Sequence, residues 1–159
     1  MKRILGFVSV VVMVALVHGV VLAQSNSSIG TWKMNPEKSK FSGTAPKDLT
    51  LTLEAQGDGV KSRSVGTAAD GTKTDWGYTA NYDRKDSPVT GTGAPGGADT
   101  VALKHINANA TAVTLKKAGK TVRTARMLVS TDGKVLRIAA KGSDADGKPM
   151  NDLIVFDKQ

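Results

Sequence analysis

Three aromatic residues stand at spacings that would let them line one side of a binding pocket. Trp76, Tyr78 and Tyr82 lie at even separations, so in an extended segment they share one face. Their rings offer flat apolar surface and the tyrosine hydroxyls offer hydrogen bonds, a combination that suits an amphipathic ligand. Aromatic residues make up only 4% of the chain, which makes the cluster informative. Packing into an ordinary protein core is the alternative interpretation.

Arg126 is the candidate interior cation. If the face that it shares with Val122 and Leu128 points inward, a guanidinium enters the interior, where a ligand carboxylate or phosphate is a natural partner. In the alternative, Met127 and Val129 point inward and Arg126 faces solvent. A β-bulge in this segment would also exchange the two faces. Both assignments remain open at the level of sequence.

Catalysis, metal binding and cofactor binding find little support. The chain has no cysteine, and His105 is the one histidine beyond the first 23 residues, which excludes multi-histidine metal sites and cysteine nucleophiles. Residues 91–96 match G-x-G-x-x-G, but the segment that follows is typical of a strand, not of the helix that a dinucleotide needs. Asp144, Asp146, Gly147 and Asp152 hint at calcium, but Gly147 is fourth from Asp144 and no Glu follows, so they indicate a hairpin turn. We predict no enzyme, no metal and no cofactor.

The first 23 residues are typical of a secretory signal peptide. Lys2 and Arg3 precede an apolar run over residues 4–17, and Ala23 ends a small-residue pattern, so we expect cleavage after Ala23. An uncleaved membrane anchor is the alternative. The predicted mature domain, residues 24–159, would then be periplasmic or secreted. Its positive charges are dispersed, which favours solvated strand faces; an anionic membrane surface is a weaker possibility, and nucleic acid is not expected.

The rest of the chain predicts one all-β domain, which we expect to be monomeric. Turn signals, mostly Gly with Asp or Asn, recur about every 11 to 14 residues, a rhythm typical of an antiparallel meander. Between turns apolar residues alternate, as at Leu49, Leu51 and Leu53. We count nine or ten strands, which would close into an up-and-down barrel to remove exposed edges. Asn35 and Pro36 form a helix-start signal, so one short helical turn is expected over residues 35–41.

The two ends of this domain resemble a known superfamily. Residues 29–34, Ile-Gly-Thr-Trp-Lys-Met, resemble the opening strand of fatty-acid-binding proteins, and the Gly30-x-Trp32 pair matches the first-strand signature of lipocalins. Residues 155–159 are similar to the aromatic-acidic-lysine ending of fatty-acid-binding proteins, and residues 126–129 to their Arg-x-Leu-Val strand. The chain therefore resembles the calycins, and most of all bacterial exported lipocalin-like proteins of unassigned function.

This resemblance implies an up-and-down barrel around a cavity for an apolar ligand. It also implies that Trp32 plugs the barrel floor, that Gly30 permits a close backbone approach, and that Arg126 corresponds to a carboxylate-binding arginine. The last-strand Arg-x-Tyr of fatty-acid-binding proteins corresponds here to Ile154, Val155 and Phe156, so both polar groups of that motif are absent. The two-helix portal is missing as well, and fatty acid is not the expected ligand.

Two functions follow from these observations. The first is a non-catalytic lipocalin-like barrel that binds a small hydrophobic or amphipathic molecule. If Arg126 points inward, its positive charge would favour an anionic ligand. Trp76, Tyr78, Tyr82 and Phe156 would supply the apolar surface. The second is an envelope interaction or stress module with a solid core, because small residues around positions 60–66 and 121–125 allow close packing.

Overall fold

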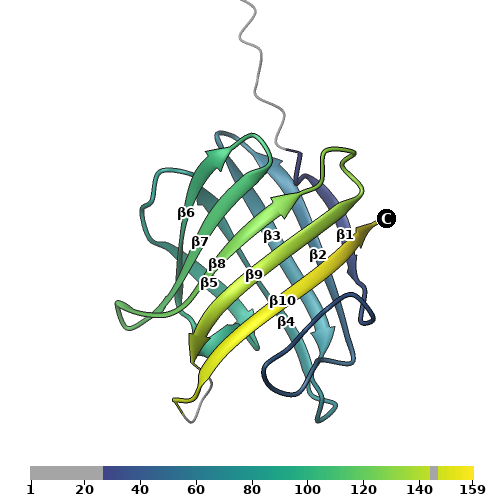
Figure 1. Cartoon of the computed structure of the whole chain (residues 1–159). Helices are drawn as coiled ribbons and strands as arrows, with labels where there is room; N and C mark the ends of the chain where they lie inside the picture. The colour runs from purple at the N-terminus through teal and green to yellow at the C-terminus, as the bar shows by residue number, and fades with distance from the viewer. Residues whose placement is uncertain (1–26, 144–146) are drawn as a thin grey trace, which may run out of the picture.

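The computed structural model describes residues 27–143 and 147–159, which form one closed antiparallel barrel of ten strands (Figure 1). The strands are β1 (Gly30–Met34), β2 (Asp48–Gln56), β3 (Gly59–Thr67), β4 (Lys73–Asn81), β5 (Ser87–Thr92), β6 (Thr100–Asn107), β7 (Ala110–Lys117), β8 (Lys120–Val129), β9 (Val135–Ser143) and β10 (Pro149–Lys158). Neighbours in the chain are neighbours in the barrel, and β1 closes the ring against β10. The predicted up-and-down barrel is confirmed.

Two parts of the sequence interpretation fall outside the described residues. The predicted signal peptide, with its cleavage after Ala23, lies in residues 1–26, and Asp144 and Asp146 lie in residues 144–146. Localisation and processing therefore stay predictions. In the described ranges, no helix has the length and apolar character needed to cross a bilayer.

Alternating side chains explain why these segments form half-buried strands. On β3 the outward residues Lys61, Arg63 and Val65 are exposed, whereas Ser62 and Ser64 between them are buried. Such a period of two places every second side chain inside the barrel. The tight connections use the expected turn chemistry, as where Asp132 Oδ1 accepts a hydrogen bond from the backbone N–H of Lys134 (3.1 Å) beside Gly133.

One end of the barrel is filled by a packed core. Trp32 and Leu136 are fully buried there, and Leu103 and Val129 are almost so. These residues come from β1, β9, β6 and β8, so the core joins strands that are far apart in the chain. The N-terminal residues 27–28 also reach this end, where Ser27 Oγ donates a hydrogen bond to Ala108 O (3.2 Å).

The opposite end is crossed by residues 35–47, which we call the strap. It connects β1 to β2 and runs beside β10, where Lys40 N donates to Leu153 O (2.7 Å) and Leu153 N donates to Lys40 O (2.8 Å). β1 has five residues and β10 has ten. The strap therefore completes the wall that β1 is too short to provide.

The helical turn predicted over residues 35–41 is shorter in the structure, where it is a single turn at residues 36–38. Asn35 does act as a cap, because its Oδ1 accepts from Lys38 N (3.1 Å), but residues 36–38 form only a turn. The chain is then drawn back to β10 by the two backbone hydrogen bonds of Lys40, which outweigh the local start signal. Within the described residues the one helix is the 3-10 turn η1 (Pro95–Gly97), between β5 and β6.

Candidate ligand-binding cavity

The half of the barrel next to the strap encloses a cavity of about 270 Å³. The packed core closes the cavity at the end away from the strap. Its most deeply buried residues, Trp32, Leu103 and Leu136, lie beyond the cavity lining. Strands β2, β3, β4, β7, β8, β9 and β10 supply the walls, and the strap and the η1 loop lie at its open end. The inward position of every second residue on these strands is what brings side chains far apart in sequence into one space.

Apolar side chains dominate the cavity walls. They come from opposite sides of the barrel and include Leu51, Trp76, Val113, Met127, Ile138, Ile154 and Phe156. Trp76 and Tyr78 lie side by side on β4, with ring centroids 6.2 Å apart and planes tilted by 36°. An apolar wall with a few fixed polar groups is the usual composition of a small-molecule site.

Tyr78 brings the first polar group into this wall. It is buried and pairs across the strands with Ser62 of β3. Burial raises the pKa of Tyr78 to about 12, while a hydrogen bond with the Ser62 side chain opposes part of that rise. The phenol is therefore neutral at physiological pH, and Ser62 and Tyr78 together present hydroxyl groups rather than charge.

A buried ion pair is the second polar feature. Arg123 on β8 donates from Nη2 to Oδ2 of Asp152 on β10 at 2.6 Å, and their side chains are only 14% and 2% exposed. The other oxygen, Oδ1, accepts from both the backbone N–H and the hydroxyl of Ser42 in the strap, each at 2.9 Å. Arg123 and Asp152 both line the cavity, so its open end holds a polar corner with no net charge.

The strap is fixed to β10 by serine hydroxyl groups. Ser39 Oγ donates to Asn35 O (2.7 Å) and accepts from Val155 N (3.0 Å), and Ser42 Oγ accepts from Asn151 N (2.9 Å). Between these two anchors Phe41 packs against the core and lines the cavity. The strap thus couples the cavity wall directly to the polar corner.

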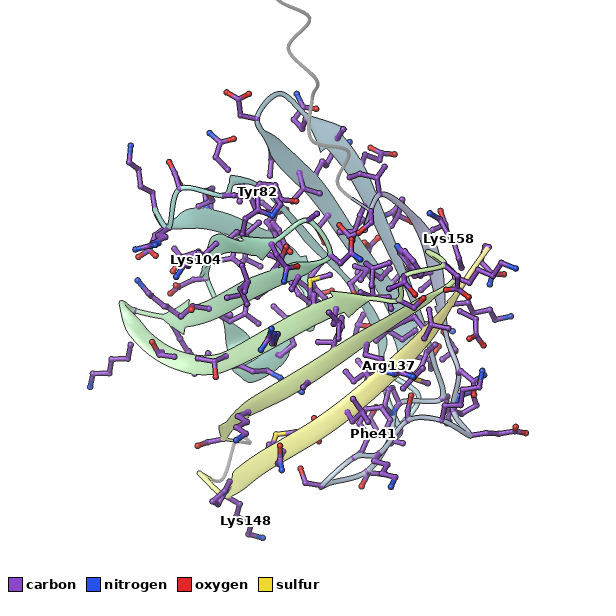
Figure 2. All side chains as sticks on the ribbon, turned by 45° about the horizontal axis from the view of Figure 1, so that its top comes forward. Phe41, Tyr82, Lys104, Arg137, Lys148 and Lys158 are labelled. Carbon is purple, nitrogen blue, oxygen red and sulfur yellow. The ribbon has the colours of Figure 1, made fainter. Side chains whose placement is uncertain are left out.

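The structure brings together three of the predicted pocket residues and separates the fourth. Trp76, Tyr78 and Phe156 line the cavity, and Tyr82 does not. Tyr82 stacks on His105 with ring centroids 3.6 Å apart, and Figure 2 shows Tyr82 and Phe41 toward opposite ends of the barrel. Partial burial lowers the pKa of His105, which keeps its ring neutral at pH 7. Ligand contact by the three lining residues stays a prediction.

The inward placement considered for Arg126 is wrong. Arg126 is exposed on the outside of β8, while Ala125, Met127 and Val129 point inward, as in the alternative interpretation. The physical reason lies in the side chains of β8, since the barrel interior takes the apolar residues and leaves the guanidinium in water. Pairing with β7 also skips Val122, a bulge that locally bends the start of the strand. Arg123 follows this bulge and is the cation that enters the cavity.

The structure places Gly30 and Trp32 on β1, at the packed end of the barrel. Trp32 is fully buried, and its Nε1 donates to Ser28 O at 2.8 Å. The sequence predicts a close backbone approach at Gly30, but the neighbour is a side chain. A Cβ on Gly30 would lie 2.9 Å from Cε of Lys158. Lys158 Nζ lies 5.1 Å from the Trp32 ring centroid, a cation–π contact that covers the barrel floor.

Sequence reasoning missed the polar corner. Asp152 was considered only for calcium, yet it shares a face with Ile154 and Phe156 and so had to point inward. Arg123 shares a face with Met127 and Val129, so it points inward once the structure places those two residues inside. Ser42 had no signal, because its position depends on how the strap folds back on β10. In the described ranges, no group of three or more potential metal ligands occurs.

The geometry defines the class of protein. A closed antiparallel barrel of ten strands around an interior cavity is a calycin-like architecture, and its strand number differs from the eight strands of lipocalins. No protein-family model matches the sequence, and no curated protein sequence matches it.

Among solved structures, the barrel is similar to zebrafish ileal bile acid-binding protein, crystallised in complex with cholic acid. The TM-score is 0.50 at 12% sequence identity, and the alignment covers 84% of this chain and 99% of the zebrafish protein. At this identity the likeness establishes the fold alone.

Proposed function

We propose that this protein binds a small hydrophobic molecule with an uncharged, hydrogen-bonding head group, and that it acts by binding and not by catalysis. The observation that carries the proposal is the cavity of about 270 Å³, apolar along its walls and polar at its open end. The fold adds support, because a barrel of the same architecture holds cholic acid in the zebrafish protein.

The polar corner favours a neutral head group over a free carboxylate. Arg123 already has an anionic partner in Asp152 at 2.6 Å, so a second anion would be repelled by Asp152 while it approached the guanidinium. A hydroxyl or carboxamide can instead accept from the remaining Arg123 N–H groups and donate to the Asp152 carboxylate. The outward position of Arg126 removes the other cation that would have favoured an anion.

Tryptophan fluorescence provides a direct test, because the chain has two tryptophans and only Trp76 lines the cavity. The neutral dye Nile red should bind with quenching of Trp76 emission, and the Trp76→Phe variant should lose that quenching while Trp32 continues to report an intact fold. Decanol should then displace the dye at a concentration about tenfold lower than decanoate, which corresponds to a difference of about 1.4 kcal/mol in binding free energy.

A matched pair of variants separates cavity binding from surface binding. Ala125 points into the cavity and its neighbour Thr124 points to solvent. Ala125→Phe should abolish dye binding, and Thr124→Phe should leave it unchanged. Displacement by decanoate ahead of decanol would reject the neutral head group, and equal effects of the two variants would reject the cavity as the site.

The second candidate function is an envelope interaction module without a ligand. One observation favours it, namely that 270 Å³ lies just below the range of about 300–1,000 Å³ usual for ligand pockets. Native mass spectrometry of the protein purified from the cells that express it distinguishes the two. Absence of any bound small molecule, together with absence of Nile red binding, would reject the binding proposal and leave this one.

A further inference from the structure

The net positive charge of the described barrel is confined to four neighbouring strands. Residues 100–143, which contain β6 to β9, carry nine lysines and arginines and one acidic residue, Asp132. Residues 27–99 carry nine basic and nine acidic residues, so they contribute no net charge. One side of the barrel is therefore strongly cationic, and the remainder is balanced.

Four of these cations lie on the outer surface of β6, β8 and β9, and we call this surface the basic face. Its members are Lys104, Arg126, Arg137 and Lys141, all of them exposed. The strand register brings them together, because Arg126 pairs with Ala139, and Lys141 and Arg137 lie two positions to either side of Ala139 on β9. Figure 2 labels Lys104 and Arg137, which mark the β6 and β9 sides of this face.

The basic face differs from the rest of the surface in its lack of counter-charges. On β3 the outward cations are paired, Arg63 with Asp75 at 2.7 Å and Lys61 with Glu54 at 3.8 Å. Among the residues that the structure describes, none of the four cations of the basic face lies within salt-bridge distance of a carboxylate. Like charges gathered without partners are unfavourable for the free protein, and an external anionic surface relieves that repulsion.

An exposed aliphatic side chain stands within the same face. Leu128 is 40% exposed and pairs across β8 and β9 with Arg137, so an apolar group and a guanidinium project side by side. Ile106, at the irregular end of β6, is 44% exposed. Aliphatic side chains beside cations suit a lipid interface, where the charge meets headgroups and the apolar part enters the acyl boundary.

We propose that the basic face docks on an anionic lipid membrane. Residues 100–143 contain no Phe, Trp or Tyr, and their one imidazole ring, His105, is already stacked on Tyr82, so this side of the barrel offers little free stacking surface for single-stranded nucleic acids. An acidic protein surface would match the charge but gives no reason for Leu128 to be exposed between arginines. The inference goes beyond the proposed function and does not depend on it.

The basic face lies next to the end of the barrel at which the cavity opens. Lys117 and Lys120 flank the β7–β8 turn, at the same end of the barrel as the η1 loop, where the structure places Lys117 Nζ 3.2 Å from a Cβ built on Gly97. Pro95 of that loop lines the cavity. A bilayer that contacts the basic face and this turn would lie beside the open end of the cavity.

Vesicle co-sedimentation tests the proposal with a matched control. The Arg126→Gln/Lys141→Gln variant removes two charges from the basic face, and Lys33→Gln/Lys61→Gln removes two exposed charges from β1 and β3. Vesicles of phosphatidylcholine, with and without phosphatidylglycerol, are the probes. The N-terminus of the purified chain is read by mass spectrometry, because residues 1–23 would bind lipid by themselves if retained.

We expect binding to the phosphatidylglycerol vesicles only, weakening as salt rises, and about 30-fold weaker for the Arg126→Gln/Lys141→Gln variant. The control variant should bind within a few-fold of the unaltered chain. Equal loss in both variants would overturn the proposal by showing that net charge alone matters. Equal binding to both vesicle types, or binding to polyglutamate in place of vesicles, would overturn it as well.

Discussion

Asp152 is the residue on which the open end of the barrel depends. One carboxylate oxygen receives the Arg123 guanidinium and the other receives two hydrogen bonds from Ser42, so the side chain joins β8, β10 and the strap. A buried carboxylate with this many donors is well compensated for its loss of water. Each partner in turn relies on Asp152 for its own position.

Replacing Asp152 should therefore be costly. Asp152→Asn keeps the size of the side chain but leaves the Arg123 charge buried without a counter-ion, and we expect a loss of about 3 kcal/mol in the free energy of unfolding. Urea denaturation followed by fluorescence measures it. Asp75→Asn breaks the exposed pair with Arg63 and serves as the control, with a much smaller change expected. Equal losses would show that the buried pair contributes no more than a surface pair.

Tyr78 gives the molecule an identifiable limit at high pH. Its pKa in the folded protein is about 12, above the value of about 10 for a free tyrosine. The unfolded chain thus loses this proton first, and stability falls as pH rises from about 10 toward 12. Tyr78→Phe should flatten this part of the stability curve, which denaturation at a series of pH values would reveal. An unchanged slope would mean that Tyr78 is accessible to water.

At the residue scale the sequence predicts types of group better than their orientation. Trp76, Tyr78 and Phe156 could be assigned to the interior because apolar aromatic residues at even spacing have one stable placement. Arg126 and Arg123 could not be distinguished, because β8 carries acceptable residues on both faces and its direction is fixed only by pairing with β7 and β9. Asp152 shares a face with Ile154 and Phe156, but a buried carboxylate needs a partner, and that partner is supplied by β8.

The strap is the element that sets this barrel apart from a plain meander. It has no regular secondary structure, yet over residues 35–42 its backbone and two serine hydroxyls hydrogen-bond to β10. Local sequence predicts a helical turn here, because Asn35 and Pro36 carry start signals that take no account of β10. Tertiary pairing decides the outcome, and that pairing is invisible to any short window of sequence.

Removing the serine anchors should loosen the strap without unfolding the barrel. In Ser39→Ala/Ser42→Ala, the amides of Val155 and Asn151 lose their hydroxyl acceptors, and their hydrogen exchange should accelerate about tenfold each. Ser130→Ala is a matched control at the opposite end, where the hydroxyl accepts from Val135 N at 3.0 Å, and only that amide should respond. Unchanged exchange at Val155 and Asn151 would mean that the strap is held by its backbone bonds alone.

As a whole molecule, the barrel is a ring in which every strand depends on two neighbours. The pairing is uneven, with nine register pairs between β9 and β10 and only two between β5 and β6. The chain has no cysteine, so no disulfide can join neighbouring strands. The closed ring and the number of strands could be predicted from the spacing of the turns. The weak pairing between β5 and β6 could not, because it arises from the irregular η1 loop between them.

A ring of this kind should unfold as one unit. Trp76 reports on the cavity and Trp32 on the packed core, so Trp76→Phe and Trp32→Phe variants isolate one signal each. The transitions that each variant shows by fluorescence and by circular dichroism should coincide in urea, because opening one seam exposes strand edges on both sides. A Trp76 signal that changes ahead of the circular dichroism would reveal a cavity half that opens independently.

The seam between β1 and β10 also constrains when the protein can exist in its final form. Trp32 faces Lys158 and Met34 faces Phe156, so the first strand has to wait for the last to complete its partner. On a ribosome, the growing chain can assemble hairpins as they emerge, but the ring stays open until residues 156–158 have been released. Closure of the ring therefore comes after every other strand has been made, and any factor that meets the chain before then encounters an unclosed sheet with its hydrophobic side accessible.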